Sequence, residues 1–244
     1  MDIAATDVGS NSALKAMLPQ THRTKEARVI LCSSAKGGTG KSTTVRSLAS
    51  FAAKEGFRVA TIDLDAQQTL SKWWGHRPES LPPITNYDQV PPEEAGTAVV
   101  EIAASGDHDI VFVDTAPGVE HLSSQLKTIL MRSDLVLVPT TDGAEDLIAV
   151  SDWMKVVRSE GRPAWYLLCR VDKALGMFGE AKRFLGKQGR GNLCAHEVRT
   201  MQAIRRSFID GRGPADFVGK AGQRAAEDYE LVWIFVKRQL GMED

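Results

Sequence analysis

The sequence predicts an α/β protein in which a mostly parallel central sheet is flanked by helices on both faces. Short apolar runs rich in β-branched residues alternate with longer segments of helical periodicity. The runs also lack the in–out alternation of half-exposed strands, which is typical of a parallel sheet covered on both sides. Polar segments follow four of the runs. Because ligands bind at the carboxyl ends of parallel strands, we expect these segments to form the functional edge of the sheet.

Five strands and one helix are predicted first, in chain order. The expected strands cover residues 28–33, 57–65, 109–114, 133–141 and 163–172. The helix is expected from Lys41, because Val45, Leu48 and Ala52 recur after it at helical spacing. Gly56 is a helix stop signal, so this helix ends before the second strand begins.

The remaining segments complete the expected architecture. Residues 144–161 have helical periodicity, whereas residues 79–96 are rich in proline and are expected to form a surface loop. Residues 1–27 lack periodicity and are expected to be a mobile arm, with a partner-binding arm as the alternative. Residues 28–244 then form a single domain.

The chain ends in a helix with a broad apolar face. Its apolar residues are Leu231, Val232, Ile234, Phe235 and Val236. Acidic residues flank them on both sides, and acids repel the anionic lipids to which amphipathic membrane helices bind. We therefore expect this helix to dock on the core, and we expect no membrane partner.

Composition narrows the class of protein. A formal net charge of -1 gives no global sign of a nucleic-acid or membrane partner. No apolar run approaches the ~20 residues of a membrane span, and the N-terminus lacks the pattern of a signal peptide. The three cysteines are far apart and form no CxxC pair, which is typical of a reducing compartment. We therefore expect a cytoplasmic protein without structural zinc.

The stretch SSAKGGTGKSTT, residues 33–44, is suited to a polyphosphate. Its glycines let backbone N–H groups approach the ligand, and the positive end of the following helix adds to them. Lys41 is a point charge for the phosphates, and the Ser42 hydroxyl is a ligand for Mg²⁺. The expected phosphate-binding residues are Gly37, Gly38, Thr39, Gly40, Lys41, Ser42 and Thr43. Ala35 replaces the first glycine of the usual pattern, and Lys36 is an additional lysine.

The additional lysine gives the stretch a family resemblance. It resembles the deviant Walker A motif, K-G-G-x-G-K-[ST], of the ParA/MinD superfamily of P-loop ATPases. The resemblance implies a three-layer P-loop NTPase fold, Mg²⁺-dependent ATP hydrolysis and an ATP-dependent homodimer. Lys36 matches the signature lysine of the family, which implies that it reaches the phosphates bound by the facing subunit.

Two further motifs extend the resemblance. DLDAQQ is similar to the family's D-x-D-P-Q motif, with Ala66 in place of proline. It implies that Asp65 orients the attacking water and that Asp63 lies near the Mg²⁺ shell. IVFVDTAPG resembles the Walker B strand, which implies that Asp114 holds Mg²⁺ through water. The implied catalytic residues are therefore Lys36, Lys41 and Asp65, and the implied metal site combines Ser42, Asp63 and Asp114.

Basic residues are concentrated between residues 181 and 224. They are Lys182, Arg183, Lys187, Arg190, Arg199, Arg205, Arg206, Arg212, Lys220 and Arg224, against the acids Glu197, Asp210 and Asp216. A basic face is sufficient for DNA binding that ignores sequence. A solvated arginine-rich surface is the alternative.

The segment RRSFIDGRGPADF resembles the region before the terminal helix of short partition ATPases. Within it, Arg205 and Arg206 are the expected phosphate contacts on DNA. Residues 1–27 are too few for the N-terminal helix-turn-helix domain of long ParA proteins. Residues 169–173, CRVDK, lie where a loop could contact the base of the nucleotide.

The resemblance therefore implies a short ParA-type ATPase associated with the nucleoid. It would bind DNA non-specifically and segregate a plasmid or chromosome when a cargo-bound adaptor of the ParB or centromere-binding type stimulates hydrolysis. One alternative is a related ATPase that positions a protein assembly, such as a chemoreceptor, secretion or conjugation complex. A second alternative is a nucleotide-dependent scaffold that does not hydrolyse ATP.

Overall fold

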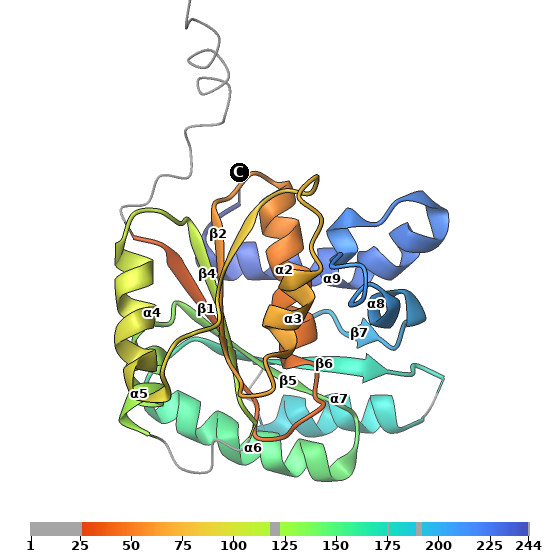
Figure 1. Cartoon of the computed structure of the whole chain (residues 1–244). Coiled ribbons are helices and arrows are strands. Elements are labelled where there is room, and N and C mark those ends of the chain that lie inside the picture. The colour runs from red at the N-terminus through yellow and green to blue at the C-terminus, as the bar shows by residue number, and fades with distance from the viewer. Residues whose placement is uncertain (1–25, 118–122, 175, 189–191, 244) are drawn as a thin grey trace, which may run out of the picture.

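A computed structural model describes residues 26–117, 123–174, 176–188 and 192–243. Within these residues the chain forms one seven-stranded sheet with the order β3-β2-β4-β1-β5-β6-β7 (Figure 1). Every neighbouring pair is parallel, so the expected fold class is confirmed. The arm expected at residues 1–27 lies outside the described residues except for Glu26 and Ala27.

The five expected strands and the expected helices are present. The strands are β1 (Arg28–Cys32), β2 (Val59–Leu64), β3 (Ile84–Tyr87), β4 (Ile110–Thr115), β5 (Leu135–Thr140), β6 (Ala164–Val171) and β7 (Val198–Arg199). The α-helices are α2 (Lys41–Lys54), α3 (Thr69–Gly75), α4 (Ala95–Ala104), α5 (Ser124–Arg132), α6 (Ala144–Ser159), α7 (Gly176–Gln188), α8 (Gln202–Arg206) and α9 (Gly219–Leu240). Two 3₁₀ turns, η2 (Pro92–Glu94) and η3 (Pro214–Asp216), complete the described elements.

The two edge strands are not predicted by the sequence. β3 lies inside residues 79–96, where the sequence predicts a surface loop, so that prediction is wrong for Ile84–Tyr87. It is also wrong for η2 and for the first two residues of α4, which fall in the same segment. Only Ile84 of its four residues is buried, and β7 has two residues. Such short, half-exposed edge strands carry too few apolar residues to give a periodic signal.

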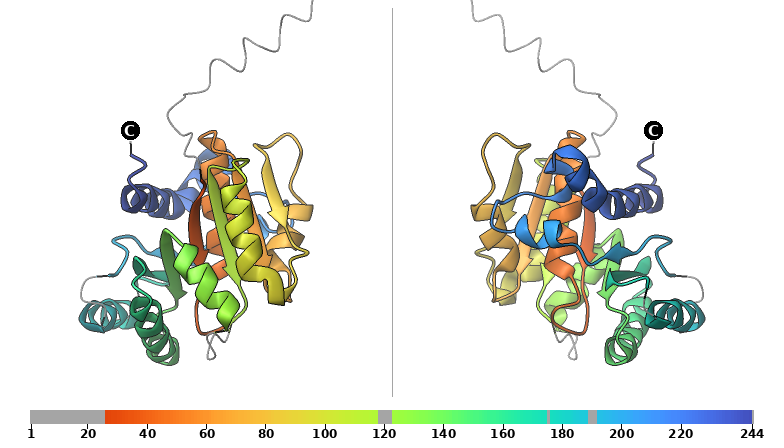
Figure 2. Two further views of the ribbon diagram at one scale, coloured as in Figure 1. Left: turned by 90° about the vertical axis from the view of Figure 1, so that its left-hand side faces the viewer. Right: turned by 90° about the vertical axis from the view of Figure 1, so that its right-hand side faces the viewer.

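Each central strand sends alternate residues into two separate cores. In β1, Ile30 and Cys32 belong to the core beneath α2, α3 and α9, whereas Val29 and Leu31 belong to the core beneath α4, α5, α6 and α7. Figures 1 and 2 show the three layers that result. Burial on both faces explains why the strands read as continuous apolar runs.

The terminal helix α9 docks on the core, as expected. Val232 and Val236 are fully buried, and Phe235 is 9% exposed. Leu231 and Ile234 are 42% and 41% exposed, so the expected apolar face is narrower than the sequence indicates. Among the described residues, no helix is both long and apolar enough to cross a bilayer.

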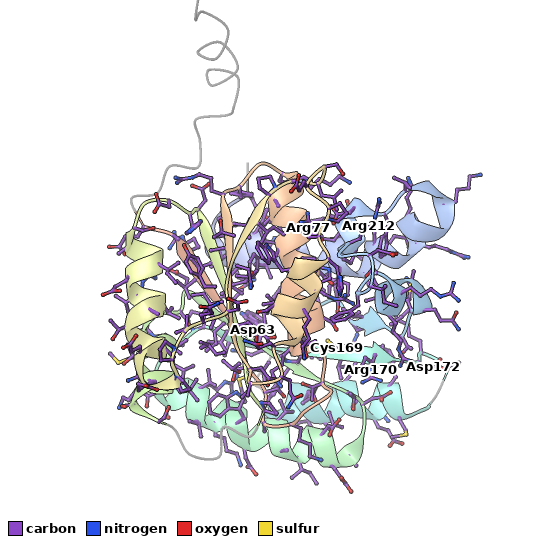
Figure 3. The ribbon with its side chains drawn as sticks, in the orientation of Figure 1. Asp63, Arg77, Cys169, Arg170, Asp172 and Arg212 are labelled. Atoms are coloured by element: carbon purple, nitrogen blue, oxygen red, sulfur yellow. The ribbon has the colours of Figure 1, made fainter. Side chains whose placement is uncertain are left out.

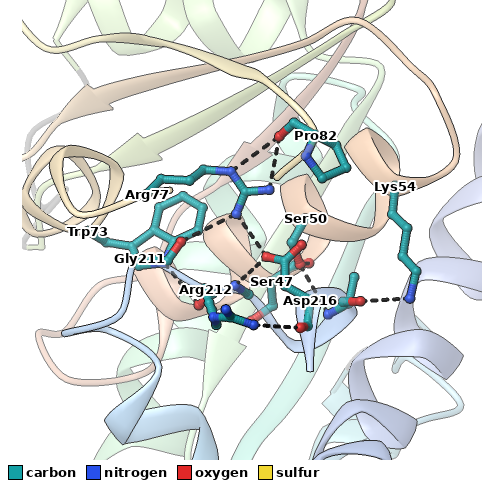
Figure 4. Close-up of polar contacts among 11 residues, drawn as sticks. Ser47, Ser50, Lys54, Trp73, Arg77, Pro82, Gly211, Arg212 and Asp216 are labelled. Carbon is teal, nitrogen blue, oxygen red and sulfur yellow. Dashed lines mark hydrogen bonds and ion pairs between the residues drawn. The ribbon is translucent and has the colours of Figure 1, made fainter. Parts of the chain in front are cut away.

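A buried ion pair fixes the segment before α9 against α2 and α3 (Figure 4). Arg77 donates a 2.8 Å hydrogen bond to Asp216, and their side chains are only 5% and 2% exposed. The indole N–H of Trp73 donates to the carbonyl of Arg212 at 3.0 Å. A Cβ on Gly213 would collide with a serine side chain of α2, so the close approach requires glycine. These contacts set the position from which α9 starts.

Arg77→Ala should lower the free energy of unfolding by about 3–5 kcal/mol, because it leaves the buried Asp216 carboxylate without its cation. Denaturation by guanidinium chloride measures this change. Lys155→Ala is the matched control, because it breaks a pair with Asp152 in which both side chains are 70% exposed, and it should leave stability unchanged. Equal stabilities for Arg77→Ala and the wild type would contradict the role of the pair.

Candidate functional site

The parallel register brings the ends of three strands together. Cys32, the last residue of β1, pairs with Asp114 in β4, and Asp63 in β2 also pairs with Asp114. The glycine-rich loop follows β1, and Asp65 lies one residue beyond β2. Figure 3 shows Asp63 and Cys169 toward the end of the sheet at which α2 begins. The loops expected to act together therefore lie at one edge.

Two glycines permit the conformation of the loop. Gly38 and Gly40 have φ values of 76° and 106°, in the left-handed region that favours glycine. A Cβ on Gly40 would also lie 3.3 Å from the Cβ of Cys169. Gly40 is the N-cap of α2 and has no side chain with which to cap it. The backbone N–H groups of the first turn therefore stay available for an anion.

Most of the expected phosphate-binding residues line a cavity of about 470 Å³. Gly37 is exposed at its rim, and Ser42 and Thr43 line it from the first turn of α2. Thr39 is buried instead, and its hydroxyl donates to the carbonyl of Lys36 at 3.4 Å. Thr39 thus shapes the loop rather than the cavity.

The two lysines of the loop have different partners. Lys41 is 5% exposed, and its ammonium donates to the carbonyl of Lys36 at 3.1 Å. The ammonium of Lys36 lies 3.3 Å from carboxylate oxygens of both Glu145 and Asp146, in the first turn of α6. Desolvation opposes the charge on Lys36, but hydrogen bonds to Asp146 and Glu145 raise its pKa above the ordinary value. The signature lysine therefore contacts acids of its own chain.

Asp114 is a buried carboxylate whose oxygens make no well-formed hydrogen bond among the described residues, although the Ser42 hydroxyl is near enough to lower its pKa. Its side chain is fully buried, and neither oxygen has a partner among the residues described. Burial raises the pKa of Asp114 to about 7; the nearby Ser42 and Lys41 oppose this shift, and Asp63 adds to it. An unpaired carboxylate in the interior is costly, so this position favours a cation.

Asp63 and Asp65 are held in different ways. Asp63 accepts hydrogen bonds from the backbone N–H and the hydroxyl of Ser71 at 2.9 Å, and from the N–H of Asp65 at 3.1 Å. Asp63 therefore ties β2 to α3. Asp65 accepts from the N–H of Gln67 at 2.9 Å and borders both the first cavity and a second one of about 410 Å³. Asp63 also lines the second cavity, but of the two acids only Asp65 lines the first.

Two arginines on the cavity wall belong to no motif. Arg170 falls within the expected base-contacting segment 169–173, donates to the Gly38 carbonyl at 2.8 Å and has a φ of 58°. Arg46 in α2 donates to the carbonyl of Ile204 at 2.5 Å, and burial lowers its pKa to about 10. These contacts join residues 132 and 158 positions apart, so no local pattern could reveal them.

The arginines expected to contact DNA lie in α8. Both Arg205 and Arg206 are exposed, and Arg205 also lines the first cavity whereas Arg206 does not. Met201 and Ile204 line the same part of the wall. This apolar surface next to a guanidinium is chemically suited to a planar base.

The basic residues between 181 and 224 do not form one face. Lys182 and Lys187 belong to α7, which packs on the core beneath α4 to α7, whereas Arg205 belongs to α8 on the opposite side of the sheet. Lys182 is also paired with Glu197 at 3.2 Å. Arg190 lies outside the described residues. Of these basic residues, those in α8 and at the start of α9 therefore remain candidates for a DNA-binding surface.

Comparison with known proteins decides the family. Residues 30–213, well over half of the chain, match the CobQ/CobB/MinD/ParA nucleotide binding domain. The chain belongs to this family. The resemblance carried by the glycine-rich loop is confirmed, and the matched residues 30–213 include that loop and the first turn of α2.

Two relatives match over part of their length. Protein virC1 of Rhizobium radiobacter is 32% identical over 114 residues, which cover 43% of this chain and 45% of that protein. Protein ParA of Rhizobium radiobacter is 27% identical over 137 residues, which cover 54% of this chain and 57% of that protein. The chain thus spans less than two thirds of the length of these curated relatives.

Three solved structures share the fold at low sequence identity. MinD in the MinC:MinD complex of Aquifex aeolicus has a TM-score of 0.71 at 16% identity, covering 89% of this chain and 97% of that one. MinD of Pyrococcus horikoshii with Mg-ADP has a TM-score of 0.66 at 16% identity, covering 87% and 98%. A plasmid partition protein of Borrelia burgdorferi has a TM-score of 0.63 at 16% identity, covering 87% and 99%.

Arg205→Ala should weaken the binding of both ADP and ATP by about tenfold, because a guanidinium would be lost from the cavity wall. Isothermal titration calorimetry measures both affinities. Arg206→Ala is the matched control, since it removes the same charge from the next residue of α8 without altering the cavity. If both variants bind nucleotide like the wild type, Arg205 does not contact it.

Proposed function

We propose that this chain is a short ParA-type ATPase that dimerises around ATP, binds DNA non-specifically and positions a cargo. The proposal rests on two features that lie at the same edge of the sheet. One is the uncapped N-terminus of α2 with Lys41, and the other is the buried Asp114 carboxylate, whose oxygens make no well-formed hydrogen bond among the described residues. The ParA relative and the partition-protein fold support a plasmid or chromosomal cargo. In this proposal an adaptor of the ParB or centromere-binding type, bound to the cargo, stimulates hydrolysis.

The residues present fit Mg²⁺ beside the nucleotide. Asp114 offers two buried carboxylate oxygens without donors among the described residues, and Ser42 offers a hydroxyl at the start of α2. Such oxygens are the ligands that Mg²⁺ prefers. Asp63 already accepts three hydrogen bonds, so it would support the site from outside. When bound, Mg²⁺ neutralises charge on the phosphate oxygens.

Each remaining residue has a proposed role, which rests on position for Lys41 and Asp65 and on the family resemblance for Lys36. The backbone N–H groups of α2 and the ammonium of Lys41 bind the phosphates. Asp65 orients the attacking water from the cavity wall, and its hydrogen bond from Gln67 fixes the carboxylate. Lys36 neutralises the phosphates of the facing subunit, so that ATP holds the dimer together and loss of the γ-phosphate releases it.

DNA binding is assigned to α8 and the start of α9. Arg206, Lys220 and Arg224 are exposed there. A dimer carries two copies of this surface, so that avidity raises the affinity for one DNA segment without new contacts. A protein acting in this way would be cytoplasmic and associated with the nucleoid.

Lys41→Ala should weaken ATP binding about 100-fold, because the phosphates lose a charged hydrogen bond.

Lys36→Gln should bind ATP like the wild type yet remain monomeric, because the phosphates of the facing subunit lose the charge that Lys36 supplies. Calorimetry gives the affinities, and light scattering with ATP gives the mass. A Lys36→Gln protein that dimerises like the wild type would show that Lys36 has no role between subunits.

Arg206→Glu should abolish binding to random duplex DNA, because it replaces a phosphate contact with a repulsive charge. ATP-dependent dimerisation should be unchanged, since Arg206 does not line the nucleotide cavity. Mobility shift with ATP or ADP, at two salt concentrations, measures the effect. Arg238→Glu, which alters the 68% exposed side chain of Arg238 near the end of α9, is the control for net charge. Absence of DNA binding by the wild type at low salt would remove DNA from the proposal.

A further inference from the structure

Lys36 is held at two points within its own subunit. Its carbonyl accepts a hydrogen bond from the ammonium of Lys41 at 3.1 Å. Its ammonium lies 3.3 Å from both Glu145 and Asp146. The residue expected to reach a facing subunit is therefore engaged at its backbone and at its side chain in a single subunit.

The two acids are positioned by the start of α6. The Thr141 hydroxyl donates to Asp146 at 2.6 Å and accepts from the N–H of Gly143 at 3.2 Å. The Asp146 side chain is 24% exposed and thus has a defined place, whereas the Glu145 side chain is 93% exposed. Asp146 provides the fixed partner for Lys36, and Glu145 adds a second negative charge from solvent.

A bound nucleotide would release the first of these points. Lys41 lines the cavity, and its ammonium donates to the Lys36 carbonyl in the structure. Polyphosphate oxygens carry full negative charge, so they attract the ammonium more strongly than a neutral carbonyl does. Once Lys41 turns to the phosphates, Lys36 is held by its side chain alone.

We propose that Glu145 and Asp146 are positioning residues that retain Lys36 in its own subunit and so set the concentration at which ATP drives dimerisation. This inference rests on the proposed function, in which Lys36 acts across the dimer. A half-exposed pair of this kind is weak, so the phosphates of a facing nucleotide can displace the acids. The acids compete with that nucleotide for one ammonium, and their removal should favour the dimer.

The test compares three variants that each remove one negative charge from the same edge. Glu145→Gln and Asp146→Asn remove partners of Lys36, and the amide of Asn can still accept from Thr141. Asp142→Asn is the matched control, because Asp142 precedes α6 by two residues and has no ion pair in the described chain. Each protein is studied by sedimentation equilibrium with a non-hydrolysable ATP analogue and Mg²⁺, and its ADP affinity is measured by calorimetry.

Glu145→Gln and Asp146→Asn should each lower the dimer dissociation constant about two- to fivefold relative to Asp142→Asn. Their affinities for ADP should equal that of the wild type, because the acids do not line the nucleotide cavity. Addition of Lys36→Gln to either variant should abolish the gain. A dimer constant that is equal in all three variants would overturn the inference while leaving ATP-dependent dimerisation in place. A wild type that stays monomeric with the analogue would instead refute the proposed function.

Discussion

The first turn of α2 concentrates positive charge at the edge of the sheet, and the other functional residues are arranged around it. Gly40 leaves the backbone N–H groups uncapped, and Lys41 is buried directly beside them. The parallel register then places Asp114, a fully buried carboxylate, at the end of the neighbouring strand. Donors without an anion and a carboxylate without a cation are both costly in an interior. An anionic nucleotide with its Mg²⁺, as proposed for this site, would satisfy both requirements together.

The sequence was sufficient to predict an element where the residue types within that one segment are restricted by its own burial or backbone conformation. The strands that are apolar on both faces and the loop with Gly38 and Gly40 could be recognised, because burial and left-handed φ values restrict the residue types allowed. The edge strands β3 and β7 could not, because four and two half-exposed residues give no period. Arg46 could not be recognised either, and Arg170 could be placed only as part of the segment 169–173, since the partners of both arginines are more than a hundred residues away in the chain.

The sequence alone could not show which of the basic residues between 181 and 224 share a surface. The excess of basic residues between 181 and 224 suggests one surface, but α7 and α8 pack against opposite cores. Two arginines adjacent in the sequence also differ in their surroundings, since Arg205 borders the first cavity and Arg206 does not. Because α8 takes part in the cavity wall and also carries the proposed DNA contact, a nucleotide in the cavity lies close to the surface whose binding it is proposed to control.

In the proposed mechanism, Lys36 completes a nucleotide site in the facing subunit. Mixing Lys36→Gln with Lys41→Ala tests it most directly, because one subunit would bind ATP and the other would supply the missing lysine. The measurement is phosphate release with Mg²⁺ by each variant alone and by the mixture. Neither variant alone should hydrolyse ATP, whereas the mixture should. A mixture as inactive as its components, under conditions in which the wild type turns over, would contradict this role of Lys36.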